Sequence, residues 1–153
     1  MPDSISIARV AVLRVGRDEG GKPDPAVPDV VMAQCLDALP EAIFVLNPTG
    51  KTVFFNRAAY RYFGPGIDWS RSPEERDHLF HPDDRGPRRE ARERALKQGL
   101  RTRHSVRAVR IDYAPRWQSV ELTPLFDRNA MIIGAVVRMT DIHEQRDRRS
   151  PAD

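Results

Sequence analysis

Residue types that carry catalytic or metal chemistry are scarce in this chain of 153 residues. The one cysteine, Cys35, rules out an intrachain disulfide and a cysteine-based metal cage. Because it falls in an apolar segment, we expect Cys35 to pack as a small apolar side chain. The sequence contains no Gly-x-Ser-x-Gly elbow, phosphate-binding loop or zinc-binding helix motif, which argues against an enzyme. A small-molecule enzyme on an α+β frame stays open as a distant alternative.

Three histidines, His78, His81 and His104, fall in the middle of the chain, where one of them could serve as a haem ligand. His81 is followed by a proline and by Asp83 and Asp84, a cluster that could also suggest a metal site. Carboxylates in the first turn of a helix are explained by the helix dipole, and no spacing fixes a second histidine nearby. We therefore expect His81 to cap a surface helix, predict no metal site, and keep haem as a minor alternative.

Residues 85–103 are strongly basic. The basic side chains are Arg85, Arg88, Arg89, Arg92, Arg94, Lys97, Arg101 and Arg103, against Glu90 and Glu93. An acidic partner, an anionic ligand or nucleic acid would each suit such a segment. No aromatic residues alternate with the arginines for base stacking, and the formal net charge of the chain is only +3. We expect a solvated helix face, with Ala91 and Ala95 packed inward, and no binding of nucleic acid.

Local patterns divide the chain into an arm (1–28), a domain (29–147) and a tail (148–153). In the arm, residues 4–15 favour a strand and residues 16–25 a flexible linker. No stretch approaches the roughly 20 apolar residues of a membrane span, and arginines interrupt the apolar start of the chain. We therefore expect a cytoplasmic protein with no membrane contact.

Within the domain, capping and turn residues mark the elements. The expected order is a helix from Val30 to Leu39 capped by Asp29, strands 42–46 and 52–55 joined by a turn at 47–50, a helix 57–63 capped by Asn56, a helix start at 72–75, a regular helix 88–98 stopped by Gly99, strands 102–113, 117–126 and 131–137, and a polar exit helix 141–147. This order predicts an α+β fold: a five-stranded antiparallel sheet, short helices on one face, an N-terminal cap helix and a C-terminal exit helix.

The last strand, 131–137, is apolar without alternation. Such a strand needs cover on both faces. The short helices can cover one face, so we expect the cap helix or a second subunit to cover the other. The pattern therefore favours a homodimer formed through the cap helix and the outer face of the sheet.

Several motifs over about residues 30–147 resemble, in order and spacing, the PAS (Per-Arnt-Sim) sensory domain family. They are the run LDALPEAIFVLNPTGK from Leu36 to Lys51, Asn56-Arg57-Ala58-Ala59-Tyr60 followed by Gly64, His81-Pro82-Asp83-Asp84-Arg85, and the series Trp117, Glu121, Pro124, Asp127, Gly134 and Asp141-Ile142. The chain departs from the pattern at Ala130, where a turn glycine is usual, at His143, where threonine is usual, and at 112–115, which contain no glycine. We expect Asn129 to supply the positive φ that Ala130 disfavours.

The resemblance implies a signal-sensing and protein-interaction module of bacterial signal transduction, such as a two-component system. A ligand or partner would act at a pocket between sheet and helices, and the exit helix and dimer interface would transmit the signal. Its partner would be a kinase, regulator or cyclase, in cis or in trans. The candidate pocket residues are Phe44, Phe54, Tyr60, Phe63, Leu79, Phe80, Val106 and Val120.

The resemblance also bears on the cofactor. A flavin of the light-oxygen-voltage type needs a reactive cysteine in a pocket helix, whereas Cys35 falls in the cap helix. We expect no covalently bound cofactor, with a small metabolite as the possible ligand. Two alternatives stay open: a ligand-free adaptor or dimerisation domain, and a haem-binding gas or redox sensor.

Overall fold

A computed structural model of the protein describes residues 25–69 and 72–149. The strand expected at 4–15 and nearly all of the linker at 16–25 lie outside these ranges. The elements are α2 (Val30–Asp37), β1 (Ala42–Leu46), β2 (Thr52–Phe55), α3 (Arg57–Phe63), the 3₁₀ helix η1 (Pro73–Leu79), α4 (Pro82–Gln98), β3 (Thr102–Val109), β4 (Pro115–Phe126), β5 (Ile132–Asp141) and α5 (His143–Arg149). None of these helices combines the length and apolar composition that a membrane span requires.

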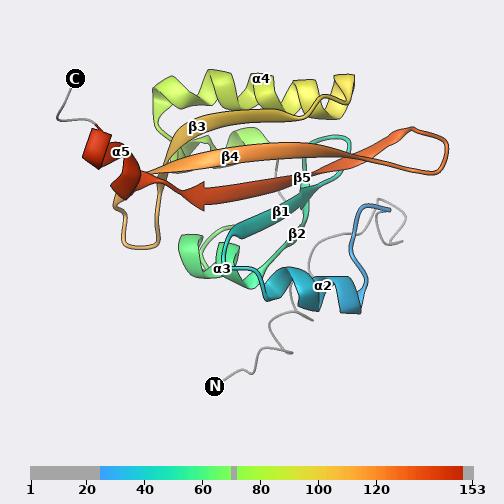
Figure 1. The fold of residues 1–153 in the computed structure, drawn as a ribbon, viewed down its shortest axis with the longest axis horizontal. Coiled ribbons are helices and arrows are strands. Elements are labelled where there is room, and N and C mark those ends of the chain that lie inside the picture. The colour runs from blue at the N-terminus through green and yellow to red at the C-terminus, as the bar shows by residue number, and fades with distance from the viewer. Residues whose placement is uncertain (1–24, 70–71, 150–153) are drawn as a thin grey trace.

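The five strands form one antiparallel sheet in the order β2-β1-β5-β4-β3, which confirms the predicted α+β class. The crossover from β2 to β3 contains α3, η1 and α4. Figure 1 shows α4 running along β3, with α3 and α2 beside the β1–β2 end of the sheet. The hydrophobic core lies between the sheet and these helices.

The outer face of the sheet differs from the expectation of apolar cover. β5 continues four residues beyond the predicted end, and there buried Met139 alternates with exposed Arg138 and Thr140. Arg138 lies 3.5 Å from the carboxylate of Glu121, on the face opposite the core. Part of the unalternating stretch is covered from within the chain, because buried Ala26 packs next to Gly134. Charge along β4 and β5 removes the need for a full apolar cover.

The long helix α4 begins at Pro82, six residues before the predicted regular part. His81 caps it as predicted, since its ring Nδ1 accepts a hydrogen bond from the Asp83 N–H at 3.1 Å. Pro87 lies inside the helix, where its nitrogen cannot donate a hydrogen bond to the preceding turn. Gly99 ends the helix as predicted, with φ 67°.

The β4–β5 turn corrects the prediction for Asn129. Ala130 itself adopts the positive φ, at 62°. The Asp127 side chain holds the turn by accepting hydrogen bonds from the Asn129 and Met131 N–H groups at 2.8 and 3.0 Å. These bonds fix the backbone and impose the left-handed conformation on the alanine.

Asn56 caps α3 as predicted and also joins three elements. Its side-chain oxygen accepts hydrogen bonds from Ala59 N–H (3.0 Å) and Ile43 N–H (2.9 Å). Its amide nitrogen donates to the carbonyl oxygens of Leu36 (2.8 Å) and Glu41 (2.9 Å). With 1% of its surface exposed, Asn56 satisfies buried backbone groups that water cannot reach.

Candidate ligand cavity and exit-helix junction

A cavity of about 60 Å³ lies between the sheet and the crossover helices. Its apolar wall consists of Phe44, Leu46, Val120, Leu122, Val137 and Met139 from the sheet, and Phe63, Trp69, Pro73 and Phe80 from the crossover. The aromatic side chains contact one another, with Phe44 and Trp69 ring centroids 4.9 Å apart. The cavity has room for a ligand of a few non-hydrogen atoms, whereas drug-sized molecules occupy pockets of about 300–1,000 Å³.

Four of the eight predicted pocket residues line this cavity: Phe44, Phe63, Phe80 and Val120. The other four, Phe54, Tyr60, Leu79 and Val106, do not.

Strand alternation and packing explain these four positions. Phe54 pairs with Val45, so it faces the side of the sheet opposite Phe44. Tyr60 stacks on Phe55, and Val106 is completely buried in the core. Leu79 is buried behind the cavity wall.

The cavity is also lined by three arginines that are not among the predicted pocket residues: Arg76, Arg88 and Arg92. Arg88 and Arg92 were expected on a solvated helix face, and that prediction is wrong. They share the inward face of α4 with Ala91 and Ala95, which are both buried. The helical spacing of 88, 91, 92 and 95 was the signal that could have identified them.

Aromatic rings and carboxylates hold these guanidinium groups in place. The Arg88 guanidinium lies 4.0 Å from the centre of the Phe80 ring, and that of Arg76 lies 5.1 Å from the Trp69 ring. Arg88 Nη1 is 3.0 Å from Asp77 Oδ1.

Further polar contacts of these arginines come from η1 and from the sheet. Arg92 Nη2 is 3.2 Å from Glu74 Oε1, and Arg76 Nη2 donates to the Thr52 hydroxyl at 3.3 Å. The cavity wall is therefore apolar over most of its area and positively charged at one side.

Burial changes the titration of these groups. Burial first, and then the neighbouring arginines, lower the pKa of Arg88 to about 9. Burial and Arg92 likewise lower the pKa of Arg76 to about 10. Both arginines remain charged at neutral pH. Burial and then Arg88 lower the pKa of His104, which lines the same cavity and whose two ring nitrogens have no hydrogen-bond partner, so this imidazole is neutral at pH 7.

The other candidates for ligand chemistry lie on the surface. His78 and His81 are exposed and do not line the cavity. Cys35 is exposed on α2, so the prediction of a packed cysteine is wrong: the helix turns Ala33, not Cys35, into the core. Among residues 25–69 and 72–149, no three histidine, cysteine, aspartate or glutamate side chains lie close enough together to hold a metal ion.

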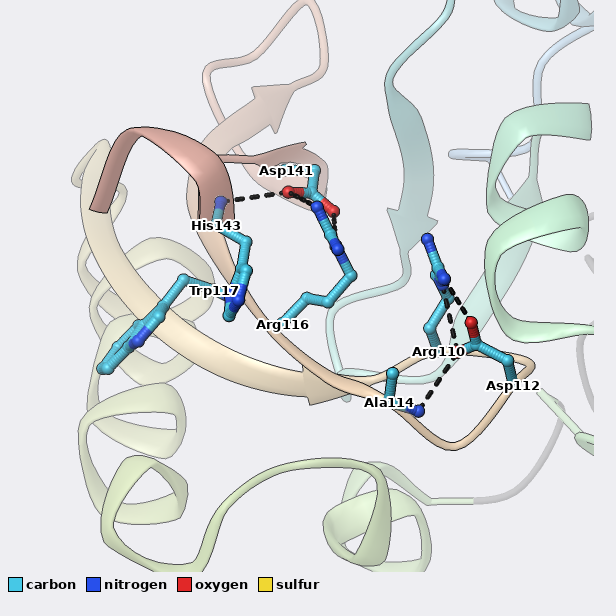
Figure 2. Close-up of polar contacts among 7 residues, drawn as sticks. All are labelled: Arg110, Asp112, Ala114, Arg116, Trp117, Asp141 and His143. Atoms are coloured by element: carbon cyan, nitrogen blue, oxygen red, sulfur yellow. Dashed lines mark hydrogen bonds and ion pairs between the residues drawn. The ribbon is translucent and has the colours of Figure 1, made fainter. Parts of the chain in front are cut away.

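The exit helix α5 is attached to the sheet by a polar junction (Figure 2). Asp141, the last residue of β5, accepts hydrogen bonds from Arg116 Nε at 2.6 Å and from the His143 N–H at 3.0 Å. His143 Nδ1 in turn accepts from the Trp117 N–H at 3.3 Å. The guanidinium of Arg146 lies 3.8 Å from the centre of the Trp117 ring. The first turn of α5 is thus fixed to β4 as well as to β5.

Burial alone would raise the pKa of Asp141, but hydrogen bonds from Arg116 and from the His143 backbone outweigh it and hold that pKa below its ordinary value. The junction carboxylate is therefore charged at neutral pH. Figure 2 also shows Arg110 paired with Asp112, which caps the Ala114 N–H in the β3–β4 turn. The hydrogen bond from Arg110 lowers the pKa of Asp112 to about 2.

Strands β4 and β5 both line the cavity, and the start of β4 and the end of β5 form the junction. On β5, Val137 and Met139 line the cavity and Asp141 follows two residues later. On β4, Val120 lines the cavity three residues after Trp117. The sheet therefore provides a short covalent path between cavity and exit helix.

Residues 36–147 match the protein family described as the PAS fold. The peroxide stress-activated histidine kinase mak1 of Schizosaccharomyces pombe is 26% identical over 122 residues, which is 79% of this chain but 7% of that kinase. The chain thus spans a small part of this curated relative. Sensor domains of the PAS fold are generally not catalytic.

Two solved structures show the same fold. The PAS domain of a Colwellia psychrerythraea protein has a TM-score of 0.61 at 18% identity, covering 74% of this chain and 96% of that one. The Vibrio cholerae VqmA dimer has a TM-score of 0.60 at 14% identity, covering 77% and 53%. That structure is of the dimer in the absence of its target DNA, and another solved structure is of a VqmA–ligand–DNA complex. The expectation that this chain does not act with nucleic acid therefore finds no support among these structures.

Proposed function

This chain belongs to the PAS fold family, whose sensory domains occur in histidine kinases and other signalling proteins, and we propose that it is a cytoplasmic signal-sensing module whose cavity controls the exit helix. A small ligand in the cavity would change the packing of β4 and β5. That change would alter the junction at Asp141 and the direction or stability of α5, which a signalling partner reads in cis or in trans.

One observation carries this proposal: the junction residues lie two or three positions from cavity-lining residues on the same strands. Met139 lines the cavity, and two residues later Asp141 holds both Arg116 and the start of α5. A strand is stiff along its length, so displacement of Met139 by a ligand is carried to Asp141. The contacts of Asp141 and Trp117 with His143 and Arg146 hold the first turn of α5 to the sheet, so loss of this junction would release the helix.

Replacing Asp141 with alanine should detach α5 and loosen the cavity strands, because coupling between two sites is reciprocal. We expect amide hydrogen exchange, followed by mass spectrometry, to rise at least about tenfold in α5 and also to rise in residues 118–122 and 137–139. Glu90→Ala is the matched control: it removes one carboxylate from an exposed ion pair with Arg94 on α4. Exchange that rises only in α5, with the cavity strands unchanged, would refute the coupling.

We also propose that the domain forms a homodimer through the exposed apolar face of α2. Val30, Val31 and Met32 are 56%, 71% and 53% exposed, an unusual exposure for three consecutive apolar residues. In sedimentation velocity at micromolar concentration, Val31→Glu should shift the protein from dimer to monomer. Leu100→Glu makes the same change at an exposed apolar residue outside α2 and should leave the dimer intact. A wild-type monomer under these conditions would end this proposal.

The small volume of the cavity favours a second candidate, a ligand-free adaptor. In that case side chains fill the site, and only partner contacts through α2 or α5 carry the signal. Isothermal titration with small organic anions separates the two: heat that saturates with ligand supports the sensor, and its absence for every compound tested supports the adaptor.

A further inference from the structure

We propose that the cavity binds a small carboxylate, held by Arg76, Arg88 and Arg92, with the apolar part of the ligand against Phe63 and Trp69. This inference rests on the proposed sensor function, because it names the class of ligand that would be the signal.

The charges at the cavity wall favour an anionic ligand. Three guanidinium groups and one imidazole line it, and no acidic side chain does. The carboxylates that pair with the arginines, Asp77 and Glu74, lie outside the lining. A planar guanidinium offers a fork of donors that matches a carboxylate in bidentate geometry.

The three arginines are also largely buried. Arg76 is 4% exposed, and the side chains of Arg88 and Arg92 are 16% and 11% exposed. An arginine needed only for solubility would extend into water, whereas placing three like charges around one cavity costs free energy. Asp77 and Glu74 offset part of this repulsion from outside the cavity, and an anion between the three arginines would offset more of it.

The remaining wall defines the rest of the ligand. The apolar side chains of the sheet and the aromatic rings of Phe44, Phe63 and Trp69 cannot form hydrogen bonds with polar groups of a ligand. The part of the ligand beyond its carboxylate is therefore expected to be apolar. The volume of about 60 Å³ fits a short chain rather than a sugar phosphate or nucleotide. His104, which is neutral, lines the cavity beside the arginines, with both ring nitrogens buried and without a hydrogen-bond partner.

The two tryptophans of the chain allow a direct test, because Trp69 lines the cavity and Trp117 lies at the exit junction. In ¹⁵N-labelled unaltered protein, the two indole N–H signals are assigned with Trp69→Phe and Trp117→Phe. Sodium butyrate should shift the Trp69 signal with saturation, while butyramide, its neutral amide, should not. Inorganic phosphate should bind more weakly than butyrate, because it has no apolar part.

Arg88→Gln and Arg92→Gln should each weaken butyrate binding at least about tenfold, a loss typical of one charge-assisted contact. Arg89→Gln is the matched control, since Arg89 lies on the same helix but is exposed. Urea unfolding of each variant establishes that it is folded.

The outcomes separate this inference from the proposed function. Equal binding of butyramide, binding unaffected by Arg92→Gln, or stronger binding of phosphate would overturn the carboxylate. No response to any anion overturns it as well, while the Asp141→Ala exchange experiment still decides the coupling. A shift at Trp69 without one at Trp117 keeps the carboxylate site and contradicts transmission to the exit helix.

Discussion

Replacing Gly134 with alanine is expected to lower the free energy of unfolding by at least about 3 kcal/mol, among the largest effects of any single methyl group in this chain. A Cβ at this position would lie 2.1 Å from the carbonyl oxygen of Leu46 and 3.1 Å from Ala26. The first of these atoms belongs to the backbone of β1 and has no freedom to move aside. Gly134 also has φ 157°, a conformation that side chains disfavour.

Urea unfolding followed by circular dichroism measures this loss. Gly66→Ala is the control: nothing lies within 4 Å of its Cβ position, and Gly66 is exposed in a turn outside the sheet. There alanine should change the free energy of unfolding by less than about 1 kcal/mol, because the new methyl group contacts no other part of the protein. Equal stability of the wild type and Gly134→Ala would mean that β1 and β5 are not packed as closely as the structure describes.

Asn56→Ala is expected to cost about 3 kcal/mol of unfolding free energy. The change removes four hydrogen bonds at once and leaves the Ile43 and Ala59 N–H groups without this partner in a buried site, whereas the Leu36 carbonyl oxygen keeps its bond from the Leu39 N–H. Each unsatisfied buried group costs about 1–3 kcal/mol, reduced where the backbone relaxes. The helix cap contributes about 1 kcal/mol of the total.

Asn47→Ala provides a matched comparison for Asn56. Asn47 also accepts hydrogen bonds from two backbone N–H groups, those of Thr49 and Lys51, both at 3.0 Å. This turn is exposed, so water replaces the lost bonds and the cost should stay near 1 kcal/mol or below. Thermal unfolding of the two variants under one set of conditions gives the comparison, and similar losses would argue that burial of Asn56 does not determine its contribution.

Local patterns in the sequence were sufficient for the elements and for the class of fold. Asp29, Asn56 and His81 each cap a helix where capping rules placed them, because a cap depends on residues two or three positions away. Gly99 ends α4 for the same local reason. Ala130 shows the limit of such rules, since hydrogen bonds to Asp127 placed a positive φ on the residue that propensity disfavours.

The composition of the cavity depended on contacts between distant segments. The apolar pattern led to Phe44, Phe63, Phe80 and Val120, but the direction of Phe54 follows from its pairing with Val45 across the turn. Cover for the outer face came partly from Ala26, far from β5 in the sequence.

By itself, the sequence determined the order of strands and helices and that the strands form a five-stranded antiparallel sheet, because caps, turns and periodicity act over a few residues. Only the tertiary structure decided that Arg88 and Arg92 leave the solvated face of their helix and join Arg76 at the cavity. From its residue type alone, an arginine is expected to be exposed to solvent, because a charged side chain loses no hydration there. Burial of three such charges becomes possible only where the fold brings aromatic rings and the carboxylates of Asp77 and Glu74 beside them.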